Sequence, residues 1–192
     1  MVDAGDRMRE YHKPSAVNNK KNSGYRSVPR PLVFIGQAPA RRPNGQCSGR
    51  VAAMLGLDPE DFRDRYTWMN VLVDYPGKHG KGDAFDLKMA RCAAISILDQ
   101  LKGATIVLLG RNVARAFHIS GDYFTVHEKS GAVFVLFPHP STINRFWNSE
   151  ANTARASNFL RQLSRQLSSQ SGLRPRGSSG VRRRVRREPS LG

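Results

Sequence analysis

The sequence is poor in cysteine, in acidic residues and in long apolar runs. Its two cysteines, Cys47 and Cys92, are too few for a disulfide framework or for a metal site with four thiolate ligands. No apolar run approaches the roughly 20 residues that span a bilayer, and residues 1–10 are polar, without the apolar core of a signal peptide. We therefore expect a soluble intracellular protein that has no membrane partner.

Basic residues outnumber acidic ones, with 31 Lys and Arg against 15 Asp and Glu and a net charge of +16. Residues 1–30 contain seven Lys or Arg and three acids, and residues 164–192 contain eight Arg and one Glu. Such an excess attracts polyanions, most often nucleic acid; the alternative is a solvated tail with no defined role. We expect a monomer, in the cytoplasm or associated with the nucleoid.

The middle of the chain alternates short apolar runs with amphipathic segments. Runs rich in Val, Ile and Phe predict buried strands, and apolar residues at helical spacing predict helices. The predicted strands are 32–35, 66–73, 104–110, 123–126 and 132–137, and the predicted helices are 49–56, one starting near 58, 86–101, 112–118 and 151–167. This alternation predicts a three-layer α/β/α sandwich around a mostly parallel sheet.

This domain would cover residues 31–167. A basic, mostly disordered arm over residues 1–30 would precede it, and an Arg-rich disordered tail over residues 168–192 would follow it. The loop at residues 75–82 is rich in glycine and is expected to be flexible.

Polar turns interrupted by proline end two of the predicted strands. Pro138 and Pro140 lack a backbone N–H, so a strand cannot continue through them, and His139 is displayed at the strand end. Residues 36–40 form a similar turn of small residues, which lets a ligand approach the backbone. Asn70 interrupts a third strand. Ligands of open α/β sheets bind at the carboxyl ends of strands, and these three positions would share one edge if the strands are parallel neighbours.

These residue types suit a site that processes a nucleobase. The Asn70 amide can donate and accept hydrogen bonds, so it matches the carbonyl and N–H on the edge of a flipped pyrimidine. His139 can donate to the base oxygen on which negative charge builds as the N-glycosidic bond breaks. The simpler alternatives are that Asn70 satisfies backbone groups at a strand end and that His139 is a structural loop histidine.

The order and spacing of several motifs over residues 32–165 resemble the uracil-DNA glycosylase superfamily, and most closely its thermophilic-type branches. The matching segments are Gly36-Gln37-Ala38-Pro39-Ala40 (first motif), Gly45 to Arg50 (the segment after it), Asn70-Val71-Leu72 (the strand of the base-reading Asn), Tyr75-Pro76-Gly77 (an Arg-Pro-Pro position), Ile106 to Gly110 (a Leu-Gly strand end) and His139-Pro140-Ser141 (second catalytic motif). The basic ends have no counterpart in the resemblance.

The resemblance implies a role for each matched residue. Asn70 would read the base, His139 would stabilise the departing base anion, and Gln37 would orient water through its carbonyl. The implied substrate-binding positions are Gly36, Ala38, Pro39, Cys47 and Asn70, and the implied DNA-binding positions are Arg41, Arg42, Arg50, Lys78, Ser141, Ile143, Asn144 and Arg145, with Ile143 as the apolar wedge. For Arg41, Arg42 and Lys78 a solvated surface is the alternative.

Departures from the family pattern bear on catalysis. Gln37 and Ala38 stand where many members have an acidic or amide side chain that positions water. Asp74 could supply the missing acid, or it is a solvated carboxylate at a strand end. Cys47 replaces a stacking Phe, which removes an aromatic platform of about 1–3 kcal/mol per base. We do not expect Cys47 to act as a nucleophile, because no histidine is near it in the sequence.

No cofactor is expected. An iron–sulfur cluster needs four cysteine ligands, and the chain has two. His79, His118 and His127 lack the spacing of metal ligands, so no metal site is expected.

From the resemblance we predict a monofunctional DNA glycosylase, which flips uracil or a related modified base out of DNA and hydrolyses its N-glycosidic bond, as in base excision repair. No lysine occupies a matched motif position, so hydrolysis alone is expected. One alternative is a catalytically weakened DNA-binding member of the superfamily, which the changes at Gln37, Ala38 and Cys47 motivate. Another is an enzyme that acts on a modified DNA base by different chemistry.

Overall fold

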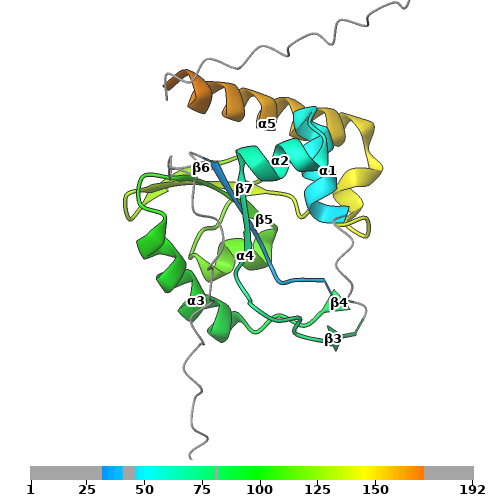
Figure 1. Cartoon of the computed structure of the whole chain (residues 1–192). Helices are drawn as coiled ribbons and strands as arrows, with labels where there is room; N and C mark the ends of the chain where they lie inside the picture. Colours follow the sequence, from blue (N-terminus) through cyan, green and yellow to red (C-terminus); the bar gives the residue numbers. More distant parts are fainter. Residues whose placement is uncertain (1–31, 41–45, 81, 171–192) are drawn as a thin grey trace, which may run out of the picture.

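The structure, a computed structural model, describes residues 32–40, 46–80 and 82–170 (Figure 1). The basic arm expected over residues 1–30 and nearly all of the tail expected over residues 168–192 lie outside this range. In chain order the elements are β1 (Leu32–Gly36), α1 (Gln46–Leu55), α2 (Pro59–Arg65), β2 (Thr67–Asn70), β3 (Lys78–His79), β4 (Gly82–Asp83), α3 (Leu87–Gln100), β5 (Thr105–Leu109), α4 (Arg111–Ala116), β6 (Val126–Lys129), β7 (Ala132–Phe137), the 3-10 helix η1 (Arg145–Asn148) and α5 (Glu150–Gln170).

Five strands form one sheet in the order β2-β1-β5-β7-β6. The first four are parallel, and β6 pairs antiparallel with β7. From β1 the chain goes to β2 on one side and later returns to β5 on the other, so the strand order reverses between β1 and β5. In doubly wound folds, such a reversal opens a crevice at the carboxyl ends of the strands.

Helices cover both faces of the sheet, as the alternating side chains of a strand require. Val33 and Ile35 of β1 point into a core shared with α3 and α4. Leu32 and Phe34 point into a second core, which α1, α2 and α5 cover. Figure 1 shows α1, α2 and α5 on one side of the sheet and α3 and α4 on the other. The α/β sandwich with a mostly parallel sheet is therefore confirmed.

Two of the predicted helices begin at an acidic cap residue. The Asp58 carboxylate accepts the backbone N–H groups of Glu60 and Asp61 at 2.8 Å, at the start of α2. Asp86 accepts the N–H of Met89 in the same way at the start of α3. Such caps satisfy N–H groups that have no partner within the helix. Across the described residues, no helix has both the length and the apolar character that crossing a membrane requires.

Three predicted segments differ from the observed elements; two of them follow one another in the chain, between residues 66 and 82. The strand predicted over residues 66–73 is β2 and ends at Asn70, because its partner β1 ends at Gly36. The loop predicted over residues 75–82 contains β3, which pairs with β4 in an antiparallel hairpin.

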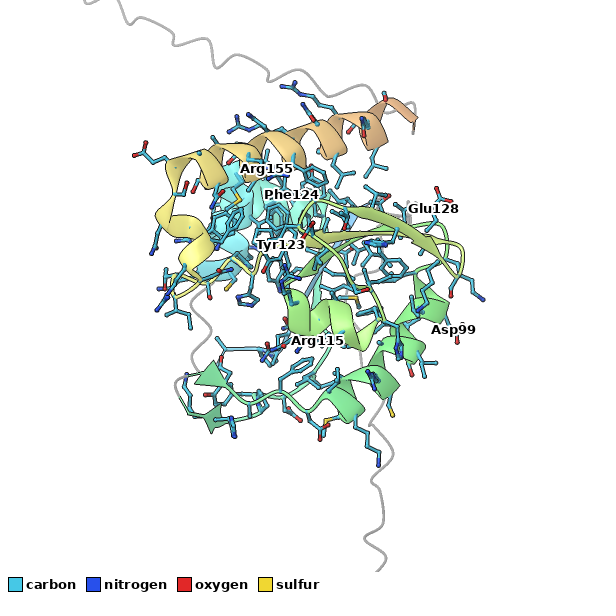
Figure 2. All side chains as sticks on the ribbon, turned by 180° about the vertical axis from the view of Figure 1, so that it is seen from behind. Asp99, Arg115, Tyr123, Phe124, Glu128 and Arg155 are labelled. Carbon is cyan, nitrogen blue, oxygen red and sulfur yellow. The ribbon has the colours of Figure 1, made fainter. Side chains whose placement is uncertain are left out.

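The strand predicted over residues 123–126 instead forms as β6, three residues later. Phe124 has a left-handed φ of 72°, which a strand does not accommodate. Its ring lies 5.2 Å from the Phe159 ring and 4.8 Å beneath the Arg155 guanidinium, both on α5 (Figure 2). Packing against α5 therefore overrides the strand preference of this aromatic segment.

Candidate active site at the carboxyl edge of the sheet

Asn70, Gly36 and His139 lie at the same edge of the sheet. Asn70 ends β2 and pairs with Gly36 at the end of β1. His139 follows β7 by two residues, and β7 is parallel to β5, which is parallel to β1. Because β5 lies between β1 and β7, β2 and β7 are three strand spacings apart, or about 14 Å. The three turns do share one edge, although their strands are not all neighbours.

Asn70 and His139 each lie beside a glycine, which has no side chain to occupy the same space. A Cβ atom on Gly36 would lie 2.5 Å from Oδ1 of Asn70, so the Asn70 amide lies directly against the backbone of β1. Gly110, with φ of +98°, follows β5, and a Cβ there would lie 3.1 Å from Cβ of His139. The Asn70 amide therefore lies against the end of β1, and His139 lies against the residue that follows β5.

The hydrogen bonds of His139 set its tautomer and its orientation. Its Nδ1 accepts the backbone N–H of Ser141 at 3.3 Å, so the neutral ring carries its proton on Nε2. Its carbonyl oxygen accepts the Trp147 indole N–H at 2.8 Å and the Asn144 amide at 2.9 Å. Burial lowers the pKa of His139 below its usual value, and the Asp83 charge partly opposes this shift. At neutral pH the ring is an uncharged Nε2–H donor.

Asp83, in the β3–β4 hairpin, was not among the residues predicted from the sequence. Its carboxylate accepts hydrogen bonds from Lys78 Nζ at 2.7 Å and from the Tyr75 hydroxyl at 3.2 Å. The bond from Lys78 is the main reason that the pKa of Asp83 is lowered, and burial only partly opposes this shift. Asp83, although exposed, is therefore held as an ionised carboxylate at neutral pH. Its surrounding sequence, Gly-Lys-Gly-Asp, carries no signal that singles it out.

Gln37 joins three parts of the chain. Its amide nitrogen donates to the carbonyl oxygen of Ala84 in the hairpin at 3.3 Å, and its amide oxygen accepts from Asn112 at the start of α4 at 3.4 Å. Both ends of the amide are therefore engaged. A hollow of about 270 Å³ adjoins this bridge, and Asp83 and Asn112 are in its lining. Asn112 is a second site residue that the sequence did not indicate.

The predicted acid Asp74 and the predicted stacking position Cys47 lie in different settings. Asp74 is exposed and makes no hydrogen bond or ion pair with another residue of the described part of the chain. Cys47 lies in the first turn of α1 and is a free thiol. Burial raises the pKa of Cys47, and the Arg50 charge only partly opposes this, so the thiol is protonated at neutral pH.

The predicted DNA-binding residues divide into groups. Ile143 is 78% exposed and Arg145 is exposed, as contacts with DNA require. Arg50 lies over the Trp147 ring at 5.5 Å, and its Nη1 is buried without a hydrogen-bond partner in the described structure. Lys78 is paired with Asp83, and Ser141 and Asn144 are hydrogen-bonded to His139. The predicted substrate-binding residues Ala38 and Pro39 are partly buried beside Gly36. Arg41 and Arg42 lie outside the described residues.

Metal-binding side chains do not gather within the described residues. No group of three or more His, Cys, Asp or Glu that could hold a metal ion is found in that part of the chain.

Comparison with known proteins gives no match: the sequence fits no known family model and is similar to no curated protein. Arguments about function therefore depend on the geometry of the site.

Proposed function

We propose that this protein is a DNA glycosylase that flips uracil or a related modified base out of DNA and hydrolyses its N-glycosidic bond. The observation that carries the proposal is that Asn70 and His139 lie at one edge of the sheet, Asn70 against the end of β1 and His139 against the residue that follows β5. The uracil-DNA glycosylase-like version of the fold, suggested by the motifs, belongs to the same proposal.

The two side chains have complementary tasks in this reaction. The Asn70 amide would donate to a pyrimidine carbonyl and accept from its N–H, which selects the polar edge of the flipped base. His139 would donate its Nε2 proton to the base oxygen on which negative charge develops. A neutral donor at this position suits an anionic leaving group, and burial of His139 favours the neutral ring.

Asp83 is the candidate for orienting the attacking water. Gln37 is engaged at both ends of its amide, and Asp74 is exposed without a partner in the described structure. The Asp83 carboxylate is also exposed, but it is ionised, hydrogen-bonded by Lys78 and Tyr75, and in the lining of the hollow beside Gln37. It would accept a hydrogen bond from water and direct the water oxygen at the sugar carbon as the base leaves.

One observation favours a catalytically weakened DNA-binding protein instead. The position equivalent to the family's water-positioning residue is Gln37, and its amide connects β1, the hairpin and α4. If Asp83 cannot take over the role of that residue, the protein would bind and flip a base without releasing it.

Base release from DNA tests the proposal. Purified protein is incubated with oligonucleotides that contain uracil, hypoxanthine or hydroxymethyluracil, and alkali then cleaves the strand at each abasic site. We expect cleavage of at least one substrate, and strongly reduced release by Asn70→Ala and His139→Gln variants that still bind DNA. Salt-sensitive binding with no release from any substrate would favour the weakened binder.

A further inference from the structure

A pocket lined by basic residues lies between α1, α2 and α5, apart from the hollow beside Gln37. It encloses about 350 Å³, and its lining includes Arg65 at the end of α2 and Arg161 and Arg165 on successive turns of α5. All three side chains are exposed, and none of the described residues that line the pocket is acidic. The pocket therefore brings three permanent positive charges together without a carboxylate.

The pocket is separate from the candidate active site. Tyr66, which also lines it, immediately precedes β2, whereas Asn70 ends β2. The pocket is therefore at the amino edge of the sheet, about 13 Å of strand away from the opposite edge. In both figures α5 lies along one end of the molecule and the β3–β4 hairpin, which contacts the active site, lies toward the other.

Contacts within the protein offset only part of this charge. Arg161 Nε donates to the Met54 carbonyl at 2.9 Å, near the end of α1, where the helix dipole favours a cation. Arg65 is in the last turn of α2, so the dipole of that helix stabilises its positive charge in the same way. Arg165 has no such helix end, and neither ion pair in the described structure involves any of the three arginines. The pocket therefore keeps an excess of positive charge, which a bound anion would offset.

The walls of the pocket are fixed in ways that suit an oxyanion. The Met54 bond uses one of the five N–H donors of Arg161 and holds the guanidinium in place. The hydroxyl groups of Tyr66 and Ser164 are hydrogen-bonded at 2.7 Å, which holds α5 against the start of β2. Guanidinium groups bind phosphate oxygens through pairs of parallel hydrogen bonds.

We propose that this pocket binds a phosphate group, carried either by a nucleic-acid backbone or by a free nucleotide. The site goes beyond the proposed base-release activity and does not depend on it. If the phosphate belongs to DNA, the protein holds its substrate at two opposite edges of the sheet or contacts two DNA segments.

Two measurements on the full chain test the site. In the first, inorganic pyrophosphate is titrated into protein labelled with ¹⁵N-arginine, and the side-chain Nε–H resonances are followed by NMR. We expect shifts at Arg65, Arg161 and Arg165 and none at Arg91, which is exposed on α3 in the opposite layer. The double variant Arg65→Gln/Arg165→Gln should weaken pyrophosphate binding at least tenfold. Arg161→Lys, which keeps the charge but loses the planar fork, should weaken it less.

In the second measurement, binding to a short DNA duplex is followed as a function of salt concentration. Loss of one backbone contact lowers the slope of log K against log salt by about 1. We expect this change in the double variant and none in Arg91→Gln, with thermal unfolding used to confirm that each variant folds.

Each result has a definite meaning. Arginine shifts together with a lower salt slope support a site for DNA backbone phosphate. Shifts with an unchanged slope support a site for a free nucleotide phosphate. Absence of pyrophosphate shifts at the three arginines, with an unchanged slope, overturns the proposal. Base release is measured separately in every variant, so failure of the phosphate site and failure of the glycosylase proposal are distinguishable.

Discussion

Substitution of Gly36 by alanine should disable Asn70 while leaving its side chain in the protein. The added Cβ would lie 2.5 Å from Asn70 Oδ1, whereas ordinary contacts begin near 3.4 Å. The amide must therefore move by about 0.9 Å, because the backbone of β1 is fixed by β2 and β5 on its two sides. A displacement of about 1 Å in a positioned group costs about 100-fold in rate.

The same substitution should affect stability only moderately. Overpacking of a buried site costs about 1–3 kcal/mol. Replacement of a strand glycine by alanine returns about 0.5–1 kcal/mol through the lower entropy of the unfolded chain. We therefore expect Gly36→Ala to lower the free energy of unfolding by at most about 2.5 kcal/mol, and kcat/KM for base release by about 100-fold.

A double-mutant cycle with Asn70→Ala isolates the cause. Without the amide, the Cβ meets no oxygen, so Gly36→Ala should have little further effect on kcat/KM in the Asn70→Ala background. Gly49 in α1 provides the matched control, because a Cβ added there would have no other atom within 4 Å. Gly49→Ala should raise the stability by about 1 kcal/mol and leave activity unchanged. Full activity of Gly36→Ala, or additive losses in the cycle, would refute the role given to Asn70.

Three further predictions test the site and the fold. Asp83→Asn should reduce base release about 100-fold, and Asp74→Asn should have a much smaller effect; the reverse order would reject Asp83 as the residue that orients water. Burial lowers the pKa of His139 in the folded protein, so the unfolded chain binds its proton first as the pH falls. Stability should therefore be lost as the pH drops below about 6.5, and urea unfolding midpoints should show a smaller acid loss in His139→Gln; equal losses would contradict this. Asp58→Ala removes the cap of α2 and should cost about 1 kcal/mol in thermal unfolding, whereas Asp64→Ala, on the same helix away from the cap, should cost much less.

Local runs of apolar residues predicted the central strands of the sheet. Strands β1, β5 and β7 lie inside the sheet, so nearly all of their residues are buried and their sequences are continuous apolar runs. Asp58 predicted a helix start because a cap acts on N–H groups two or three residues away, and the helix over residues 86–101 was predicted from the spacing of its apolar residues. Phe124 misled the prediction because its environment is set by Arg155 and Phe159 of α5, more than 30 residues later.

Local sequence likewise indicated some residues of the candidate site and missed others. His139 was indicated by its place after an apolar strand and Asn70 by its interruption of one, and the parallel pairing of β1, β2, β5 and β7 brings them to one edge. Asp83 was missed because only the folding of a glycine-rich hairpin bonds it to Lys78 and Tyr75 and places it in the lining of the hollow. Glycine-rich turns have no apolar periodicity, so nothing local in the sequence indicates which way the hairpin faces.

The sequence alone determined the alternation of strands and helices and the chemical types at the strand ends, because these depend on side chains a few residues apart. Only the tertiary structure decided that Gln37 connects Ala84 and Asn112, which are 47 and 75 positions away in the chain, and that Asp83, rather than Asp74, is hydrogen-bonded and lines the hollow beside this bridge. The three arginines of the second pocket likewise come from α2 and α5, far apart in sequence. Such contacts depend on how helices and hairpins pack against the sheet, and this packing is decided by burial across the whole domain rather than by any local run of residues.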